Sequence, residues 1–127
     1  MERLRFERLI VWRKALAFAD RIYEITKAFP RAEMFGLVSQ MRRAGVSVVA
    51  NVAEGASRSS LIDQARFSEI AYGSLSEVTT MLYLARSQGF ITSEGFEEVY
   101  LQALEVCKLL SGWRQSLRKR AQSERKQ

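Results

Sequence analysis

The sequence predicts an all-α fold, an antiparallel up-down-up-down four-helix bundle formed by a single domain over residues 1–127. Apolar residues recur at helical spacing in four long segments, and turn-forming residues separate these segments. No run of alternating β-branched residues bounded by tight turns indicates a strand. The expected helices cover about residues 9–29, 36–56, 60–88 and 93–120.

The first segment carries an unusually wide apolar arc. It ends at Pro30, which lacks the N–H that a helix interior needs and disfavours helical geometry at the preceding residue. The arc approaches half of the helix circumference, which is more than one bundle seam requires. We therefore expect either that this helix is central in the bundle or that part of its face meets another subunit.

The second segment carries two neighbouring stripes. Its apolar arc, which includes Met41, Val48 and Val52, is typical of a core face. The adjoining polar stripe contains serine and asparagine, which are poor helix formers. It can be a solvated face, an internal or intersubunit hydrogen-bond network, or a contact surface for a ligand or nucleic acid. The network is favoured because buried polar groups must be paired. The expected structural polar seam, with two residues of the third helix, comprises Gln40, Arg43, Ser47, Asn51, Glu54, Ser74 and Glu77.

The third segment has a glycine and a serine at its middle. Ser60 and Asp63 resemble a capping box at its start. Because glycine costs about 1 kcal/mol relative to alanine inside a helix, Gly73 indicates close approach of another helix, with Gly45 as the natural counterpart. The expected core stripe consists of Phe67, Ile70, Ala71, Ser74, Val78, Met81, Leu82 and Ala85.

The fourth segment follows Gly89, a residue typical of a helix C-cap. Thr92 or Ser93 caps its start, and Glu94 lies in its first turn. We expect this helix to end near Arg120 and the polar residues beyond it to fray.

Catalytic chemistry has few candidate residues. Histidine is absent and Cys107 is the only cysteine, so nearly all zinc and di-iron sites lack ligands and no Ser-His-Asp arrangement can form. No glycine loop is followed by the GKS or GKT signature of phosphate binding. Glu54 and Glu77 could act as a carboxylate pair, but ion pairs with Arg43 or Arg58 are favoured. We expect no catalytic residue, metal, cofactor or enzyme activity, and a core-packing role for Cys107.

The net charge of +6 is concentrated at the two ends of the chain. Residues 1–14 carry +3 and residues 114–127 carry +5, whereas the span between them carries −2. In an up-down bundle both ends lie at the same end of the fold and form one basic surface. Solubility and the favourable placement of cations at a helix C-terminus explain the excess equally well. The candidate nucleic-acid-binding residues are Arg3, Arg5, Arg8, Arg13, Lys14, Arg114, Arg118, Lys119 and Arg120.

No targeting segment is expected. No apolar run approaches the roughly 20 residues of a membrane span, and the N-terminus interleaves arginine with glutamate and lacks a secretory signal. We therefore expect a cytoplasmic protein with no membrane partner.

Several strings of the sequence resemble one bacterial family. They are FERLIVWRKA, the FP at Phe29 and Pro30, Glu33 with Phe35, GLVSQMRRAGVSVVANVAEG, Arg58 and RFSEIAYGSLSEV. Over about residues 6–91 the chain resembles in motif detail the four-helix bundle proteins of the 23S ribosomal RNA intervening sequence, or S23, family. Gly45 stands where the family commonly has alanine or another small residue. Val48 and Val49 stand where isoleucine and proline are frequent, so the second helix should be more regular here.

The resemblance implies a bundle that assembles into a ring-like homopentamer, and it implies no enzyme. More distantly, the chain resembles the accessory variability determinant protein of diversity-generating retroelements, a basic pentamer that engages a reverse transcriptase and nucleic acid. The first hypothesis is a non-enzymatic oligomeric binding module whose basic end contacts RNA, DNA or a nucleic-acid-bound protein. The alternative is a protein–protein scaffold with no nucleic-acid binding, including an accessory subunit of a reverse transcriptase.

Overall fold

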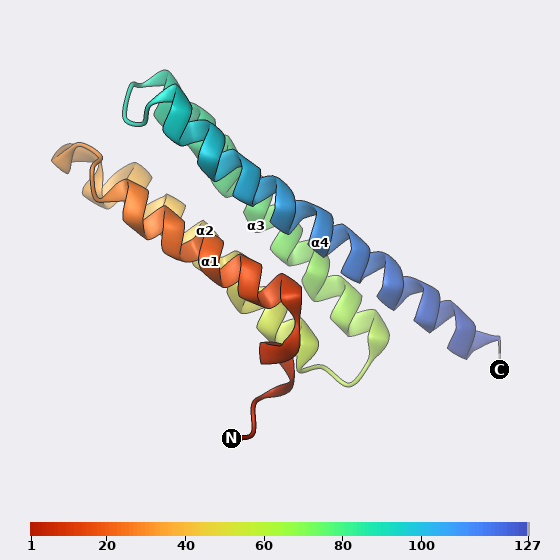
Figure 1. Ribbon diagram of the computed structural model, residues 1–127. Coiled ribbons are helices and arrows are strands. Elements are labelled where there is room, and N and C mark those ends of the chain that lie inside the picture. The colour runs from red at the N-terminus through yellow and green to blue at the C-terminus, as the bar shows by residue number, and fades with distance from the viewer. Residues whose placement is uncertain (127) are drawn as a thin grey trace.

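The computed structural model describes residues 1–126, which contain four long α-helices and no strand. α1 packs against α2 and α4, and α3 packs against the same two helices. Figure 1 shows each helix running antiparallel to the one before it, with both chain ends at the same end of the bundle. The predicted all-α fold with four helices is confirmed. The helices are α1 (Ile10–Thr26), α2 (Ser39–Ala56), α3 (Leu61–Ser87) and α4 (Ser93–Arg125).

The connection between α1 and α2 is more structured than the sequence predicts. α1 ends at Thr26, and a 3₁₀ turn over Arg31–Glu33 follows Pro30. A π-helical turn over Met34–Val38 then leads directly into α2. Gly36 departs from helical geometry within this turn, with φ −115° and ψ −106°. The regular helix therefore begins at Ser39 and not at residue 36 as predicted.

The starts of α3 and α4 are capped as predicted. The Ser60 hydroxyl accepts the Asp63 backbone N–H at 3.3 Å, and the Thr92 hydroxyl accepts the Gly95 backbone N–H at 3.0 Å. Gly89 follows α3 with a φ of +77°, a conformation that residues with a Cβ rarely adopt.

The end of α4 differs from the prediction. The helix continues to Arg125, so the expectation that it ends near Arg120 is wrong. The added turn begins with alanine, the strongest helix former, and contains neither glycine nor proline to stop it. Leu117, one turn earlier, is fully buried and anchors this part of the helix.

An apolar core fills the space between the four helices. A side chain of leucine or phenylalanine size contributes about 1.5–3 kcal/mol when it is fully removed from water. Burial of these side chains supplies the main stabilisation of the bundle, so apolar residues repeated at helical spacing are enough to specify it. The large fully buried side chains of this core include Phe18, Ile22, Met41, Val48, Val52, Val78, Leu82, Phe96, Val99 and Leu110.

The face that α3 buries differs from the predicted stripe. Leu75 is 4% exposed and belongs to the core, whereas Ile70 is 44% exposed. Ala71 and Leu75 point inward, and Gly73 lies about 200° around the helix from each of them. Gly73 is therefore on the outer face of α3.

The predicted contact between Gly73 and Gly45 is consequently wrong. No neighbouring atom lies within 4 Å of the place that a Cβ on Gly73 would take. Gly45 packs against α1 instead, where a Cβ would stand 3.6 Å from Ile22.

Part of the wide apolar arc of α1 remains uncovered by the chain itself. Leu16 is 40% exposed and Tyr23 is 44% exposed, whereas Phe18 and Ile22 are fully buried.

None of the helices in residues 1–126 is both long enough and apolar enough to cross a membrane.

Candidate functional site

The two basic ends of the chain lie at one end of the bundle, beside the connection between α2 and α3 (Figure 1). In the N-terminal group, Arg3 precedes a 3₁₀ turn over Arg5–Arg8, and Arg13 and Lys14 lie near the start of α1. Local contacts hold this turn in place. The Phe6 ring meets the Trp12 ring edge-on at a centroid distance of 5.0 Å, and Arg13 Nε donates to the Glu7 carbonyl at 3.1 Å.

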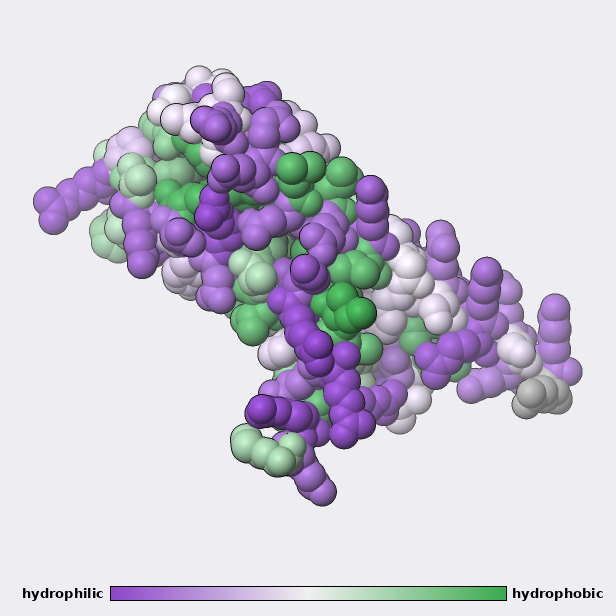
Figure 2. Space-filling view, viewed as in Figure 1, coloured by the Kyte–Doolittle hydropathy of each residue, from purple (hydrophilic) through white to green (hydrophobic). Residues whose placement is uncertain are grey.

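The C-terminal basic group lies on the last turns of α4. Arg118, Lys119 and Arg120 are exposed, and Arg114 is half-buried. Figure 2 shows hydrophilic side chains projecting into solvent along this end of the molecule. Because α4 continues to Arg125, the helix also presents Arg125 there, a cation outside the predicted set.

Three of the nine predicted cations already have side-chain partners. Lys14 Nζ lies 3.1 Å from a Glu105 carboxylate oxygen, and Arg118 forms an ion pair with Glu69. The Arg114 guanidinium lies over the Tyr72 ring, 5.5 Å from its centroid. Within residues 1–126, no ion pair joins an acid to the remaining six, which are Arg3, Arg5, Arg8, Arg13, Lys119 and Arg120.

Three residues of the predicted polar seam are hydrogen-bonded to one another between α2 and α3. The Ser47 and Ser74 hydroxyls are 2.8 Å apart and share a hydrogen bond. Asn51 Nδ2 donates to the Ser47 carbonyl at 2.8 Å and to the Ser47 hydroxyl at 3.0 Å. All three side chains are half-buried, so this small network links the two helices at their crossing.

The other four residues of the seam lie in solvent. Gln40, Arg43, Glu54 and Glu77 are exposed. Glu54, near the end of α2, pairs at 2.6 Å with Arg58 just beyond the helix, as the sequence favours. Glu54 is therefore engaged by a cation, which is the alternative that the sequence favours over a carboxylate pair with Glu77.

The described residues offer little for acid–base or metal chemistry. Residues 1–126 contain no group of three or more His, Cys, Asp or Glu that could hold a metal ion. Cys107 is half-buried and packs against the core. The neighbouring Tyr83 raises the pKa of the Tyr100 phenol above its ordinary value.

Residues 7–112 match the model of one protein family, described as the 23S rRNA-intervening sequence protein. This match spans most of the chain. The chain belongs to this family.

A solved structure with a similar fold carries the same family assignment. It is a protein of unknown function from the S23 ribosomal protein family of Bacteroides thetaiotaomicron VPI-5482, with a TM-score of 0.75 and 29% sequence identity. The match covers 83% of this chain and 98% of the Bacteroides chain. The comparison with curated proteins found no match.

This member of the 23S rRNA-intervening sequence family has a regular second helix. α2 runs without interruption from Ser39 to Ala56, through the valines at Val48 and Val49 where proline is frequent in the family. The regularity expected from the absence of that proline is therefore observed.

The sequence reasoning missed a groove on this S23 family member. The first turns of α3 and the last turns of α4 line a hollow of about 410 Å³, with Leu61 and Ala65 on one side and Leu117 and Ala121 on the other. Leu117 and Ala121 are four residues apart, so an apolar spacing that continues past Arg120 was the available signal.

Proposed function

We propose that this chain is a non-enzymatic, oligomeric module that binds RNA or DNA in the cytoplasm through its basic end. The observation that carries the proposal is the convergence of cations from both chain ends at one end of the bundle (Figure 1). Six of these cations have no acidic partner in residues 1–126. Cations of this kind bind phosphates by releasing counterions, whatever the base sequence.

Self-association would multiply this charge. The α1–α2 hairpin exposes apolar side chains that a partner subunit would cover, with Phe35 97% exposed, Tyr23 44% and Val46 42%. A ring-like homopentamer, the assembly that the family resemblance implies, would carry about +30 from five copies of +6. Light scattering tests this part directly, and a mass of one 14.5 kDa chain at working concentrations would overturn it.

Charge reversal tests the basic end. The variant Lys119→Glu/Arg120→Glu changes two exposed cations on α4. The matched control Lys27→Glu/Arg31→Glu makes the same change in net charge at the opposite end, where both residues are exposed beside the α1–α2 connection. Binding of a labelled RNA hairpin and of single-stranded DNA is measured by anisotropy at several salt concentrations.

The proposal predicts a position-dependent loss. The α4 variant should bind about tenfold more weakly or worse, with a shallower dependence of affinity on salt, and the control should stay within about twofold of the parent. Equal losses in both variants would show that only net charge matters. A parent that binds neither probe in a saturable, salt-sensitive way would exclude nucleic-acid binding.

A further inference from the structure

The groove between α3 and α4 lies only partly within the chain segment that the family model matches, because its α3 wall falls inside residues 7–112. Its α4 wall runs from Leu117 to Arg125, beyond the matched residues 7–112. Figure 1 shows these last turns of α4 projecting past α1. The family match therefore includes the α3 wall of the groove and not its α4 wall.

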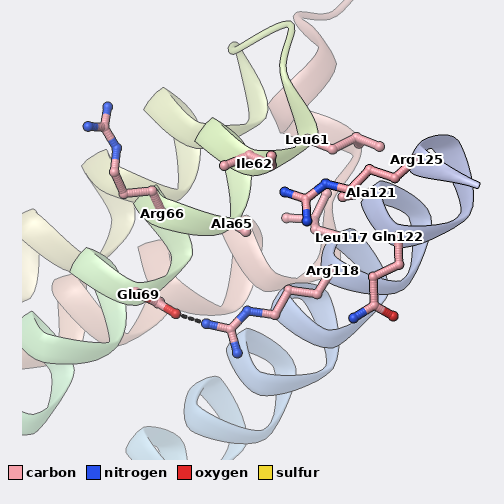
Figure 3. A pocket seen from close by; sticks show the side chains of 10 residues that line it. All are labelled: Leu61, Ile62, Ala65, Arg66, Glu69, Leu117, Arg118, Ala121, Gln122 and Arg125. Atoms are coloured by element: carbon pink, nitrogen blue, oxygen red, sulfur yellow. Dashed lines mark hydrogen bonds and ion pairs between the residues drawn. The ribbon is translucent and has the colours of Figure 1, made fainter.

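The walls of the groove are aliphatic. In Figure 3, Leu61 and Ile62 from α3 face Ala121 across the hollow. Ile62 is 55% exposed, and the small side chains of Ala65 and Ala121 leave space between the helices. A row of leucine-sized side chains from a third helix would fill this space and remove Ile62 from water.

Arginines border the aliphatic walls. Arg118 and Arg125 are seven residues apart on α4, which places them about 10.5 Å apart along the helix axis. Arg118 reaches across to its ion-pair partner Glu69, while Arg125 extends over the hollow toward α3 (Figure 3). No ion pair to Arg125 occurs among residues 1–126. With Arg66, the lining contains three arginines and one glutamate, a net charge of +2.

This combination fits a peptide helix better than a nucleic acid. Bases are bound by stacking on aromatic rings, and none of the residues that line the groove is aromatic. Carboxylates seven residues apart on a helix recur on the same face with the same rise as Arg118 and Arg125. Aliphatic side chains three or four residues after each carboxylate would then point into the hollow.

A second copy of this chain is a poorer occupant. Its nearest matching stripe is Glu98, Leu101 and Glu105 on α4, where Leu101 is 64% exposed. Both carboxylates of that stripe are already engaged, Glu98 by Arg21 at 2.9 Å and Glu105 by Lys14 at 3.1 Å. Docking would require both ion pairs to break, whereas a partner helix with the same pattern would displace only Glu69 from Arg118.

We propose that the groove between α3 and α4 binds an amphipathic helix of a partner protein that has leucine-like residues on one face and acidic residues spaced seven apart beside them. This binding shares Arg118 with the proposed contact of the basic end with nucleic acid. It is distinguished from that contact by Ile62, Ala121 and Arg125, which line the groove and are not among the nine candidate nucleic-acid-binding residues.

The test uses a defined peptide probe and the full-length protein. The probe is a synthetic helix of about 20 residues with glutamates seven apart and leucines three and four residues after each glutamate. A scrambled peptide of identical composition is its control. Binding is measured by fluorescence anisotropy at about 0.15 M salt. At this salt concentration the Debye length is about 8 Å, so long-range attraction between charges is weak.

Two pairs of variants locate the binding. Ile62→Asp changes an exposed groove residue, and Ile70→Asp makes the same change at an exposed position of α3 outside the groove. Arg125→Ser removes the arginine over the hollow, and Lys126→Ser removes an adjacent charge that does not line it.

The patterned peptide should bind at least about tenfold more tightly than the scrambled one. Ile62→Asp should weaken binding by at least about tenfold and Arg125→Ser by about threefold or more, with both controls within about twofold. Equal binding of the two peptides, or an unaffected Ile62→Asp variant, would overturn the proposal. So would a fall in oligomer mass for Ile62→Asp alone, which would assign the groove to a second copy, or an equal loss of RNA binding, which would assign it to nucleic acid.

Discussion

The two halves of α4 place the same kind of helix in different surroundings. The first half lies between α1 and α3, and its inward side chains Phe96, Val99, Ala103 and Leu110 are at most 3% exposed. The last turns project past α1 and leave Arg118, Lys119 and Arg120 in solvent (Figure 1). The first half of α4, packed on two sides, stabilises the bundle. The last turns, which extend beyond α1, leave charged side chains and an open groove accessible to solvent.

The largest effect is expected in the packed half of α4. Phe96 is 1% exposed, and its ring packs against Tyr83 and Tyr100 at centroid distances of 4.8 and 5.7 Å. Phe96→Ala should lower the free energy of unfolding by about 3–5 kcal/mol, because it removes the ring and leaves a cavity. Chemical denaturation measures the change. The control Leu101→Ala, at a 64% exposed position of the same helix, should cost less than about 1 kcal/mol. Equal losses of stability in the two variants would show that burial against α1 and α3 does not determine the stability of this half of α4.

An intermediate effect is expected where α4 leaves the core. A Cβ on Gly55 would lie 2.7 Å from Phe67 Cβ on α3 and 3.1 Å from Trp113 Cη2 on α4. The C-terminal end of α2 therefore packs closely against both of these helices. Gly55→Ala should destabilise the protein by about 1–3 kcal/mol through overpacking. Gly73→Ala, with no atom within 4 Å of the new methyl, should stabilise it by about 0.5–1 kcal/mol. If the melting temperature shifts in the same direction for both variants, the end of α2 is not tightly packed against α3 and α4.

The smallest effect is expected in the projecting turns. Ala103 is 3% exposed in the core half, and Ala121 lines the groove. Ala103→Gly should lower global stability by about 1–2 kcal/mol, from helix propensity and a lost buried methyl group. Ala121→Gly should change it by less than about 0.5 kcal/mol while amide exchange accelerates in residues 117–125. If the two glycine variants destabilise equally, the last turns of α4 fold as one unit with the core.

Much of the fold is predictable from the sequence because local rules determine it. The caps at Ser60 and Thr92 and the positive φ of Gly89 follow from single side chains. Spacing leaves the inward face of a helix uncertain by one residue, which is why Ser74 was assigned to the core in place of Leu75 and why Gly73 was paired with Gly45. The helix end predicted near Arg120 is wrong because polar residues alone do not end a helix that meets neither glycine nor proline.

The candidate site is only partly predictable for a related reason. The up-down order of the helices brings both basic ends together whatever the details of packing. Which cations are neutralised depends on how the helices align along their axes, and this alignment pairs Arg118 with Glu69, 49 residues away. The groove requires two distant segments to lie side by side, so the apolar spacing of Leu117 and Ala121 indicates only one of its two walls.

The contact between Phe6 and Trp12 has a consequence for the thermodynamics of binding at the basic end. It ties the N-terminal arginines to α1, so that ligand binding need not first order a loose tail. Association should therefore show a small heat-capacity change, set by the apolar surface that the ligand itself covers and without the large contribution of a segment that folds on binding. Replacing Trp12 by alanine would add that ordering cost and lower the affinity of the basic end without removing a single charge.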